Sequence, residues 1–123
     1  MSYLKDRINA FGYAFSGCVQ ALKTEKNLQL QLMISVLVIF AGVYFSIKVN
    51  EWLIVSACIA FVTSLELINS AIEKLCDLYS KEQNPTIKYI KDVSAAAVLV
   101  ASIFTVLAGS FVFWPYVRHL LCD

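Results

Sequence analysis

Polar side chains recur at helical spacing in an otherwise apolar part of the chain. The stretch SLELINSAIEKLCD carries Glu66, Asn69, Glu73 and Asp77. On an α-helix these positions share one stripe, so their side chains face the same place. The two glutamates stand about 10 Å apart along the helix axis, too far to share one proton. We therefore expect them to have different tasks.

These residue types favour one kind of chemistry. Glu25 precedes the first apolar segment, and Lys91 with Asp92 opens the last one. Carboxylates, an amide and a lysine suit metal-assisted phosphoryl transfer to an alcohol, because this reaction depends mainly on positioning and charge neutralisation. Mg²⁺ is usually held by one or two carboxylates plus phosphates and water, which Glu25 and Glu73 can supply together.

The pair Lys91 and Asp92 also suggests a helix terminus. Asp92 suits an N-terminal cap, whereas Lys91 at the positive end of a helix dipole is poorly placed for stability alone. A bound phosphate explains both the lysine and the exposed N–H groups of such a terminus. The small residues that follow, Ser94 among them, are interpreted as packing positions that let helices approach closely.

Other chemistries have few residues to use. His119 is the only histidine, and the four cysteines are scattered without a CxxC pair, so an imidazole-based metal site or a Ser-His-Asp triad has almost no residues to use. No GxxxxGK[ST] loop occurs, so a nucleotide must be held mainly by side chains. The net charge of +1 supplies no basic field for nucleic acid, which is not an expected partner.

Three apolar segments, 28–47, 52–75 and 93–117, position these groups. Each is near the ~20 residues that a membrane-spanning helix needs, and 59% hydrophobic residues exceeds what a small soluble domain requires. The predicted fold is all-α. One membrane-embedded domain, 1–123, consists of three transmembrane helices after a surface helix over 1–26, where apolar residues recur at three- and four-residue steps.

Lysine and arginine predict the orientation. Four precede the first span, one follows it, four flank the second loop and one follows the third span. By the positive-inside rule the N-terminus and the second loop are cytoplasmic and the C-terminus is outside. Tyr44, Trp52, Trp114 and Tyr116 then fall at the outer interface, where aromatic rings prefer to lie.

The second loop contains Asn84-Pro85, which predicts a turn. Spans two and three then form an antiparallel hairpin. This hairpin returns Lys91 and Asp92 to roughly the depth of Glu73 and Asp77, so that opposite charges can meet there.

The motifs ELINSAIEKLCD and KDVSAAAVLVASI, with TEKN upstream, resemble the small prokaryotic diacylglycerol kinase and undecaprenol kinase family over about residues 7–108. The resemblance implies a homotrimer with shared active sites in the bacterial inner membrane. It implies ATP- and Mg²⁺-dependent phosphorylation of a lipid alcohol, either diacylglycerol or undecaprenol, at the cytoplasmic interface. The NP loop and the ELINSAIE core look closer to the undecaprenol kinase branch.

The resemblance also implies residue roles. Glu66 matches the general base that takes the proton from the lipid hydroxyl. The metal-binding carboxylates near the ATP phosphates match Glu25 and Glu73. The polar residues of the nucleotide and phosphate site match Asn69, Asp77, Lys91 and Asp92.

The chain departs from the family pattern in two places. Many relatives carry a Tyr-His pair in the second loop, where this chain has Gln83 and Asn84, so any role of that histidine fails here. The segment KNLQLQ after Glu25 lacks the arginine and the acidic or histidine residues common there. The contacts at the start of the first span are therefore left open.

Two other classes of protein compete with the kinase. A small transporter or ion-conducting bundle would line a path with Glu66, Asn69 and Glu73. Such a path needs polar positions through the outer half, whereas the polar cluster lies on one side only. A structural subunit, in which these residues form a hydrogen-bond network between helices, would tolerate Glu66→Gln.

Overall fold

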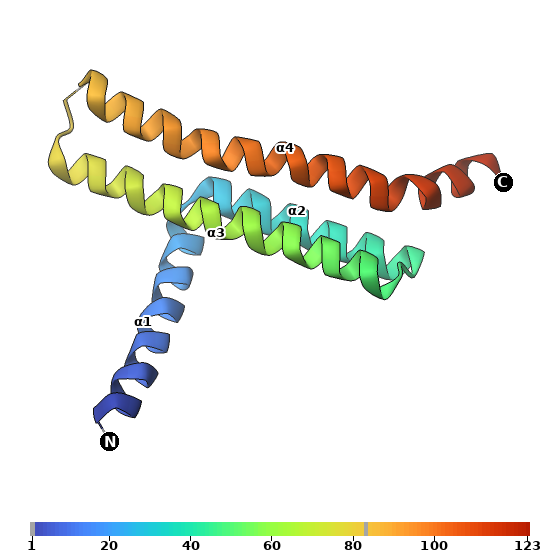
Figure 1. Cartoon of the computed structure of the whole chain (residues 1–123), viewed down its shortest axis with the longest axis horizontal. Coiled ribbons are helices and arrows are strands. Elements are labelled where there is room, and N and C mark those ends of the chain that lie inside the picture. Colours follow the sequence, from blue (N-terminus) through green and yellow to red (C-terminus); the bar gives the residue numbers. More distant parts are fainter. Residues whose placement is uncertain (1, 83) are drawn as a thin grey trace.

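The computed structural model describes residues 2–82 and 84–123 and has four α-helices (Figure 1). They are α1 (Ser2–Thr24), α2 (Lys26–Phe45), α3 (Val49–Tyr79) and α4 (Pro85–Cys122). The predicted all-α fold is confirmed. By length and composition α2, α3 and α4 can each cross a membrane, as the three apolar segments predict.

A tight turn joins α2 to α3. Ser46 adopts the left-handed conformation, with φ 52° and ψ 53°. The N–H groups of Ser46 and Ile47 donate to the carbonyls of Val43 and Gly42, at 3.2 and 3.1 Å. This arrangement satisfies the last carbonyls of the helix. It ends α2 at Phe45, two residues before the predicted end of the first span.

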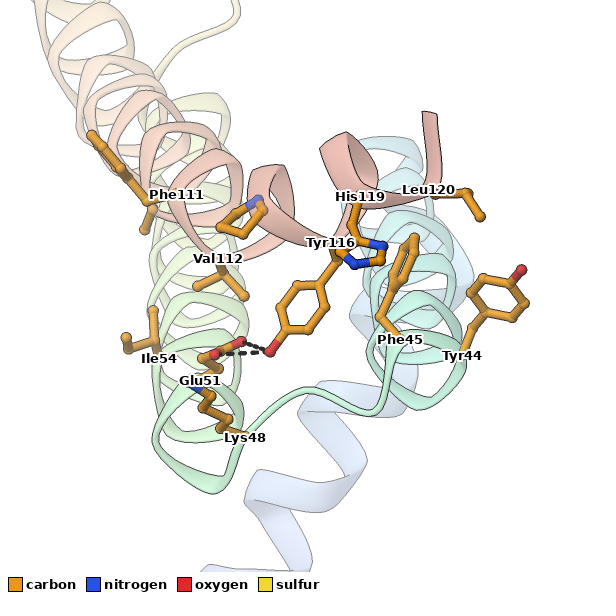
Figure 2. A pocket seen from close by; sticks show the side chains of 12 residues that line it. Tyr44, Phe45, Lys48, Glu51, Ile54, Phe111, Val112, Tyr116, His119 and Leu120 are labelled. Atoms are coloured by element: carbon orange, nitrogen blue, oxygen red, sulfur yellow. Dashed lines mark hydrogen bonds between the residues drawn. The ribbon is translucent and has the colours of Figure 1, made fainter. Parts of the chain in front are cut away.

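Close packing secures the end of the bundle at this turn. The ring of Trp52 lies so near Gly42 that a Cβ on the glycine would come within 2.6 Å of it. The hydroxyl of Tyr116 donates to the Glu51 carboxylate, 2.9 Å from Oε2 (Figure 2). Trp52 and Tyr116, predicted as interfacial aromatics, thus also hold α2, α3 and α4 together.

The opposite end of the bundle is the α3–α4 hairpin. α4 begins at Pro85, and the Asn84 side chain accepts a hydrogen bond of 2.8 Å from the Thr86 N–H. An asparagine cap followed by proline is a strong helix start. The prediction of a helix terminus at Lys91 and Asp92 was therefore wrong. Both residues lie inside α4, about two turns from its start, so no exposed N–H groups are available there.

α1 leaves the bundle at an angle (Figure 1). Glu25 is the single non-helical residue between α1 and α2, with φ −98° and ψ 110°, and the chain changes direction there. No residue of α1 is buried. Its apolar side chains, among them Phe11 and Phe15, are free to contact lipid, and the membrane-surface location of α1 stays a prediction.

Candidate active site

The buried polar residues of the described chain all come from α3. Glu66, Asn69 and Ser70 expose 3%, 5% and 7% of their surface. Their burial is the consequence of their shared face, which α2 and α4 cover. Because a buried carboxylate is costly unless hydrogen-bonded, the partners of Glu66 and Asn69 decide what this face can do.

The partner of Glu66 is a glutamine on α2. Gln31 Nε2 donates to Glu66 Oε2 across a distance of 3.4 Å. Glu73 follows Glu66 by two helical turns on the same face of α3, and Glu25 is the junction between α1 and α2, the helix that carries Gln31. The glutamates of the α3 stripe and of the α1–α2 junction are therefore gathered on one side of the bundle.

Asn69 is held from α4. Ser94 Oγ donates to Asn69 Oδ1 at 2.6 Å, so the amide oxygen is occupied and the NH₂ group is left to donate elsewhere. Asn69 lies one helical turn from Glu66 on the same face, within reach of its carboxylate. Ser94 is thus more than the small packing residue that the sequence predicts.

Ser94→Ala should lower the rate of the expected phosphoryl transfer several-fold with a small loss of stability. The variant removes the donor that holds the Asn69 amide, and hydrogen bonds between membrane helices contribute about 0.6 kcal/mol on average. Turnover and thermal unfolding of purified protein measure both effects. Ser94→Thr keeps the hydroxyl and should restore the rate, and Ser56→Ala, an exposed serine of α3, is the control. An unchanged rate in Ser94→Ala would contradict this role.

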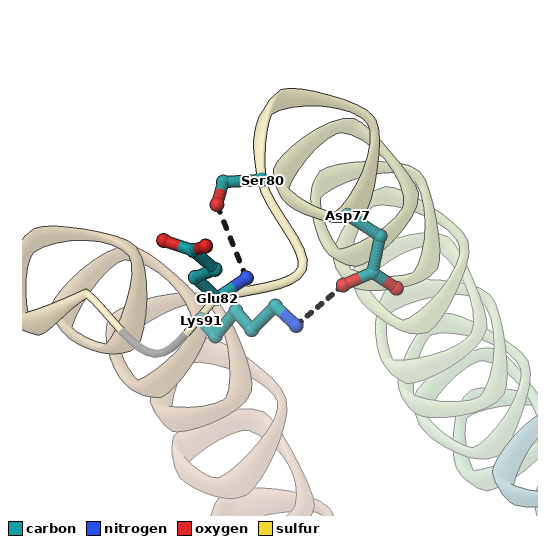
Figure 3. Close-up of polar contacts among 4 residues, drawn as sticks. All are labelled: Asp77, Ser80, Glu82 and Lys91. Carbon is teal, nitrogen blue, oxygen red and sulfur yellow. Dashed lines mark hydrogen bonds and ion pairs between the residues drawn. The ribbon is translucent and has the colours of Figure 1, made fainter.

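Closer to the α3–α4 loop, Lys91 donates to Asp77 Oδ1 at 2.7 Å (Figure 3). Both lie beyond the apolar stretches 52–75 and 93–117. The hydrogen bond from Lys91 lowers the pKa of the Asp77 carboxyl, and the same bond raises the pKa of the Lys91 ammonium. Both groups are therefore charged at neutral pH. The expected meeting of opposite charges in the hairpin is present.

The loop end of the hairpin is hollowed. An open cavity of about 570 Å³ is lined by Lys81, Lys88, Lys91, Asp77 and Asp92, among others. Its volume lies in the usual range of small-molecule sites. Asp92 pairs with Lys88 on its own helix at 2.5 Å rather than with the α3 stripe.

Asn84, at the edge of this cavity, is occupied as the cap of α4. Gln83, the other residue that replaces the Tyr-His pair, lies outside the described residues.

Glu25 and Glu73 are the carboxylates predicted to hold Mg²⁺. Within residues 2–82 and 84–123, no three His, Cys, Asp or Glu side chains gather closely enough to hold a metal ion by themselves. The ion pairs in this part of the chain involve neither Glu25 nor Glu73. Two such carboxylates suit Mg²⁺, which usually completes its shell with phosphate oxygens and water.

Comparison with known proteins identifies the family of the chain. The chain matches the model of the prokaryotic diacylglycerol kinase family over residues 12–113. The chain belongs to this family. It is a lipid kinase and, with three helices long enough to span a bilayer, an integral membrane protein. An enzyme, rather than a transporter or a structural subunit, is thereby established.

Curated relatives agree with this assignment. The chain is 32% identical over 106 residues to the undecaprenol kinase of Bacillus subtilis (strain 168), covering 86% of each protein. It is 32% identical over 98 residues to the diacylglycerol kinase of Pseudomonas aeruginosa, covering 80% of each. The diacylglycerol kinase of Escherichia coli (strain K12) is 25% identical over 109 residues, with 89% of each covered. Equal identity to both kinds of kinase leaves the acceptor undecided.

Proposed function

We propose that the protein transfers the γ-phosphoryl group of ATP, in the presence of Mg²⁺, to the primary hydroxyl of undecaprenol or diacylglycerol at the cytoplasmic membrane surface. The observation that carries the proposal is the order of contacts along α3. Glu66 meets Gln31 in the apolar region, Asn69 meets Ser94, and Asp77 meets Lys91 beside the open cavity at the loop. These three contacts follow one another along α3 and form a polar line. An acceptor in the membrane and a nucleotide from the cytoplasm can approach this polar line from opposite directions.

The geometry supports a direct displacement. Glu66 accepts the proton of the lipid hydroxyl while the hydroxyl oxygen bonds to the γ-phosphorus and the bond to the ADP oxygen breaks. Asn69, fixed by Ser94, holds the Glu66 carboxylate in place. Lys91 offsets negative charge on the phosphates. Glu25 and Glu73 would hold Mg²⁺, which when bound neutralises charge on the ATP phosphates.

The experiment that tests the proposal is transfer of labelled γ-phosphate from ATP by purified protein in lipid micelles. Undecaprenol and diacylglycerol are offered separately, each with Mg²⁺ or with excess EDTA. Labelling of one lipid that EDTA abolishes supports the proposal and selects the acceptor. If a folded protein labels neither lipid, this acceptor class is wrong.

Glu73→Gln should raise the Mg²⁺ concentration needed for half-maximal activity at least tenfold. The amide keeps the shape of the side chain but removes the negative charge that attracts the cation. Activity is measured against Mg²⁺ at fixed ATP, and excess Mg²⁺ should recover part of it. Glu51→Gln, at the opposite end of α3, serves as the control. An identical Mg²⁺ dependence in Glu73→Gln and wild type would rule out Glu73 as a ligand.

The proposal includes a homotrimer with active sites shared between neighbouring subunits. Its support is the family resemblance together with the many large apolar side chains that α2, α3 and α4 leave exposed. The mass of the detergent-solubilised protein, corrected for bound detergent, should be three times the 13.8 kDa of one chain. A monomer that retains full activity would contradict shared sites.

A further inference from the structure

A second cavity lies between α2, α3 and α4 within the apolar part of the bundle. Its volume is about 470 Å³. On α3 its lining extends from Thr63 to Ile54, about 14 Å of helix. Gln31 lies at the same end as Thr63, and Phe113 lies at the other end with Ile54. The cavity therefore starts beside the catalytic carboxylate and extends toward the far side of the membrane.

The polar atoms on its wall are not equivalent. Ser35 Oγ donates to the Gln31 backbone carbonyl at 2.8 Å, and Ser110 Oγ donates to the Val106 carbonyl at 2.7 Å. These hydroxyls are satisfied by their own helices. Gln31 Oε1, in contrast, is buried without a hydrogen-bond partner, the one such side-chain atom in the described chain. Because buried acceptors are nearly always paired, this oxygen indicates a missing donor.

The missing donor must come from a molecule of particular chemistry. It needs a hydroxyl or N–H group at one end, within reach of Gln31 and Glu66. The rest of it should be largely apolar, since the lining beyond Gln31 is mainly aliphatic. Among the described residues Phe113 is its one aromatic residue, and Thr63, Ser102 and Thr105 add hydroxyl groups to the wall. Its volume of about 470 Å³, spread along about 14 Å of helix, suits a narrow, chain-like group.

We propose that this cavity holds a single hydrocarbon chain of the lipid acceptor, whose hydroxyl donates to Gln31 Oε1 on binding. The inference rests on the proposed function and adds the subsite that selects the acceptor. Rotation about the C–O bond then directs the same proton to Glu66, whose carboxylate is the hydrogen-bond partner of the Gln31 amide nitrogen. Gln31 is a binding residue for the acceptor, and the proton leaves with Glu66.

Kinetics with acceptors of different chain length tests the cavity. Gly109 lines it, and a Cβ at this position meets nothing within 4 Å, so Gly109→Leu starts a larger side chain in open space. The KM for a long-chain acceptor should rise about tenfold, while the KM for a short-chain acceptor stays within twofold of wild type. Val100→Leu, on an exposed face of the same helix, should change neither value.

Gln31→Leu tests the hydroxyl contact separately. The KM for long and short acceptors alike should rise about tenfold and the KM for ATP should stay unchanged, while kcat also falls because Glu66 loses the Gln31 donor. A fall in kcat alone, or no change in either constant, would overturn the role of Gln31. Equal kinetics of Gly109→Leu and wild type for every chain length would overturn the cavity.

Photolabelling separates this inference from the proposed function, because it needs no turnover. A long-chain lipid alcohol with a photoreactive group at its chain end should label peptides near Ile54 or Phe113. Label confined to exposed helix faces would refute the subsite. Cross-linking of Gly109→Cys to a second chain would assign the cavity to another copy and refute it too. Absence of phosphorylation by wild-type protein would instead remove the proposed function.

Discussion

Glu66→Gln is expected to reduce lipid phosphorylation by a factor of about 10²–10⁴, the usual contribution of a general base. The amide fills the same space and can still hydrogen-bond to Gln31, but it cannot take the proton of the lipid hydroxyl. Initial rates at saturating ATP and lipid measure the loss. The KM values should change little, because the substrates bind before the proton moves.

A matched control is available on the same helix. Glu51→Gln makes the same chemical change at the other end of α3, about 22 Å away, where the carboxylate only binds Tyr116. This variant should keep most of the activity. If Glu66→Gln and Glu51→Gln are equally active, Glu66 is a structural residue and the base lies elsewhere.

Much of the fold follows from the sequence because the membrane permits few alternatives. A segment that crosses the bilayer becomes helical because each of its backbone N–H and C=O groups then has a hydrogen-bond partner within the segment. The length and hydropathy of the three apolar segments were therefore sufficient to predict three helices. The helix start at Pro85 was missed for a specific reason. Residues 85–92 are too polar to belong to a span, yet they continue the helix beyond the membrane.

The polar face of α3 was predictable from spacing alone, since Glu66, Asn69 and Asp77 share one stripe. Their partners were not predictable in the same way. Gln31 stands among leucines without a periodic pattern, and Ser94 precedes alanines, which favours a packing interpretation. Only the packing of α2 and α4 against α3 shows which side chains meet, because the angular position of each helix is set by contacts distant in sequence.

Asp92 shows how one wrong boundary alters a functional interpretation. As a cap it would have accompanied a phosphate bound to helix N–H groups, whereas inside α4 it pairs with Lys88 on the helix surface. A phosphate at Lys91 and Asp92 would therefore not find helix N–H groups there, and side-chain ammonium groups are the donors at hand. The open cavity there is lined by Lys81, Lys88 and Lys91. Of the two that form ion pairs, Lys88 and Lys91, the side chain of Lys91 is the less exposed.

Lys91→Met should lower kcat/KM for ATP by a factor of about 10²–10³, the cost of removing one preorganised donor from developing phosphate charge. Methionine retains most of the apolar stem, so the packing of α4 against α3 persists. The effect is measured from rates against ATP at saturating lipid. The KM for the lipid should stay near its wild-type value, because Lys91 lies at the opposite end of the polar line from Gln31.

Asp77→Asn separates the charge of Lys91 from its position. This change keeps Lys91 positive but weakens the bond that holds it, so the loss should be smaller than that of Lys91→Met. Because Asp77 acts through Lys91, the double variant should be no worse than Lys91→Met alone. Additive losses would instead mean that Asp77 contacts the nucleotide independently.

Lys48→Met is the control for Lys91→Met, because it removes one positive charge at the far end of the bundle. An equal loss of activity in Lys48→Met would show a general electrostatic effect rather than a site.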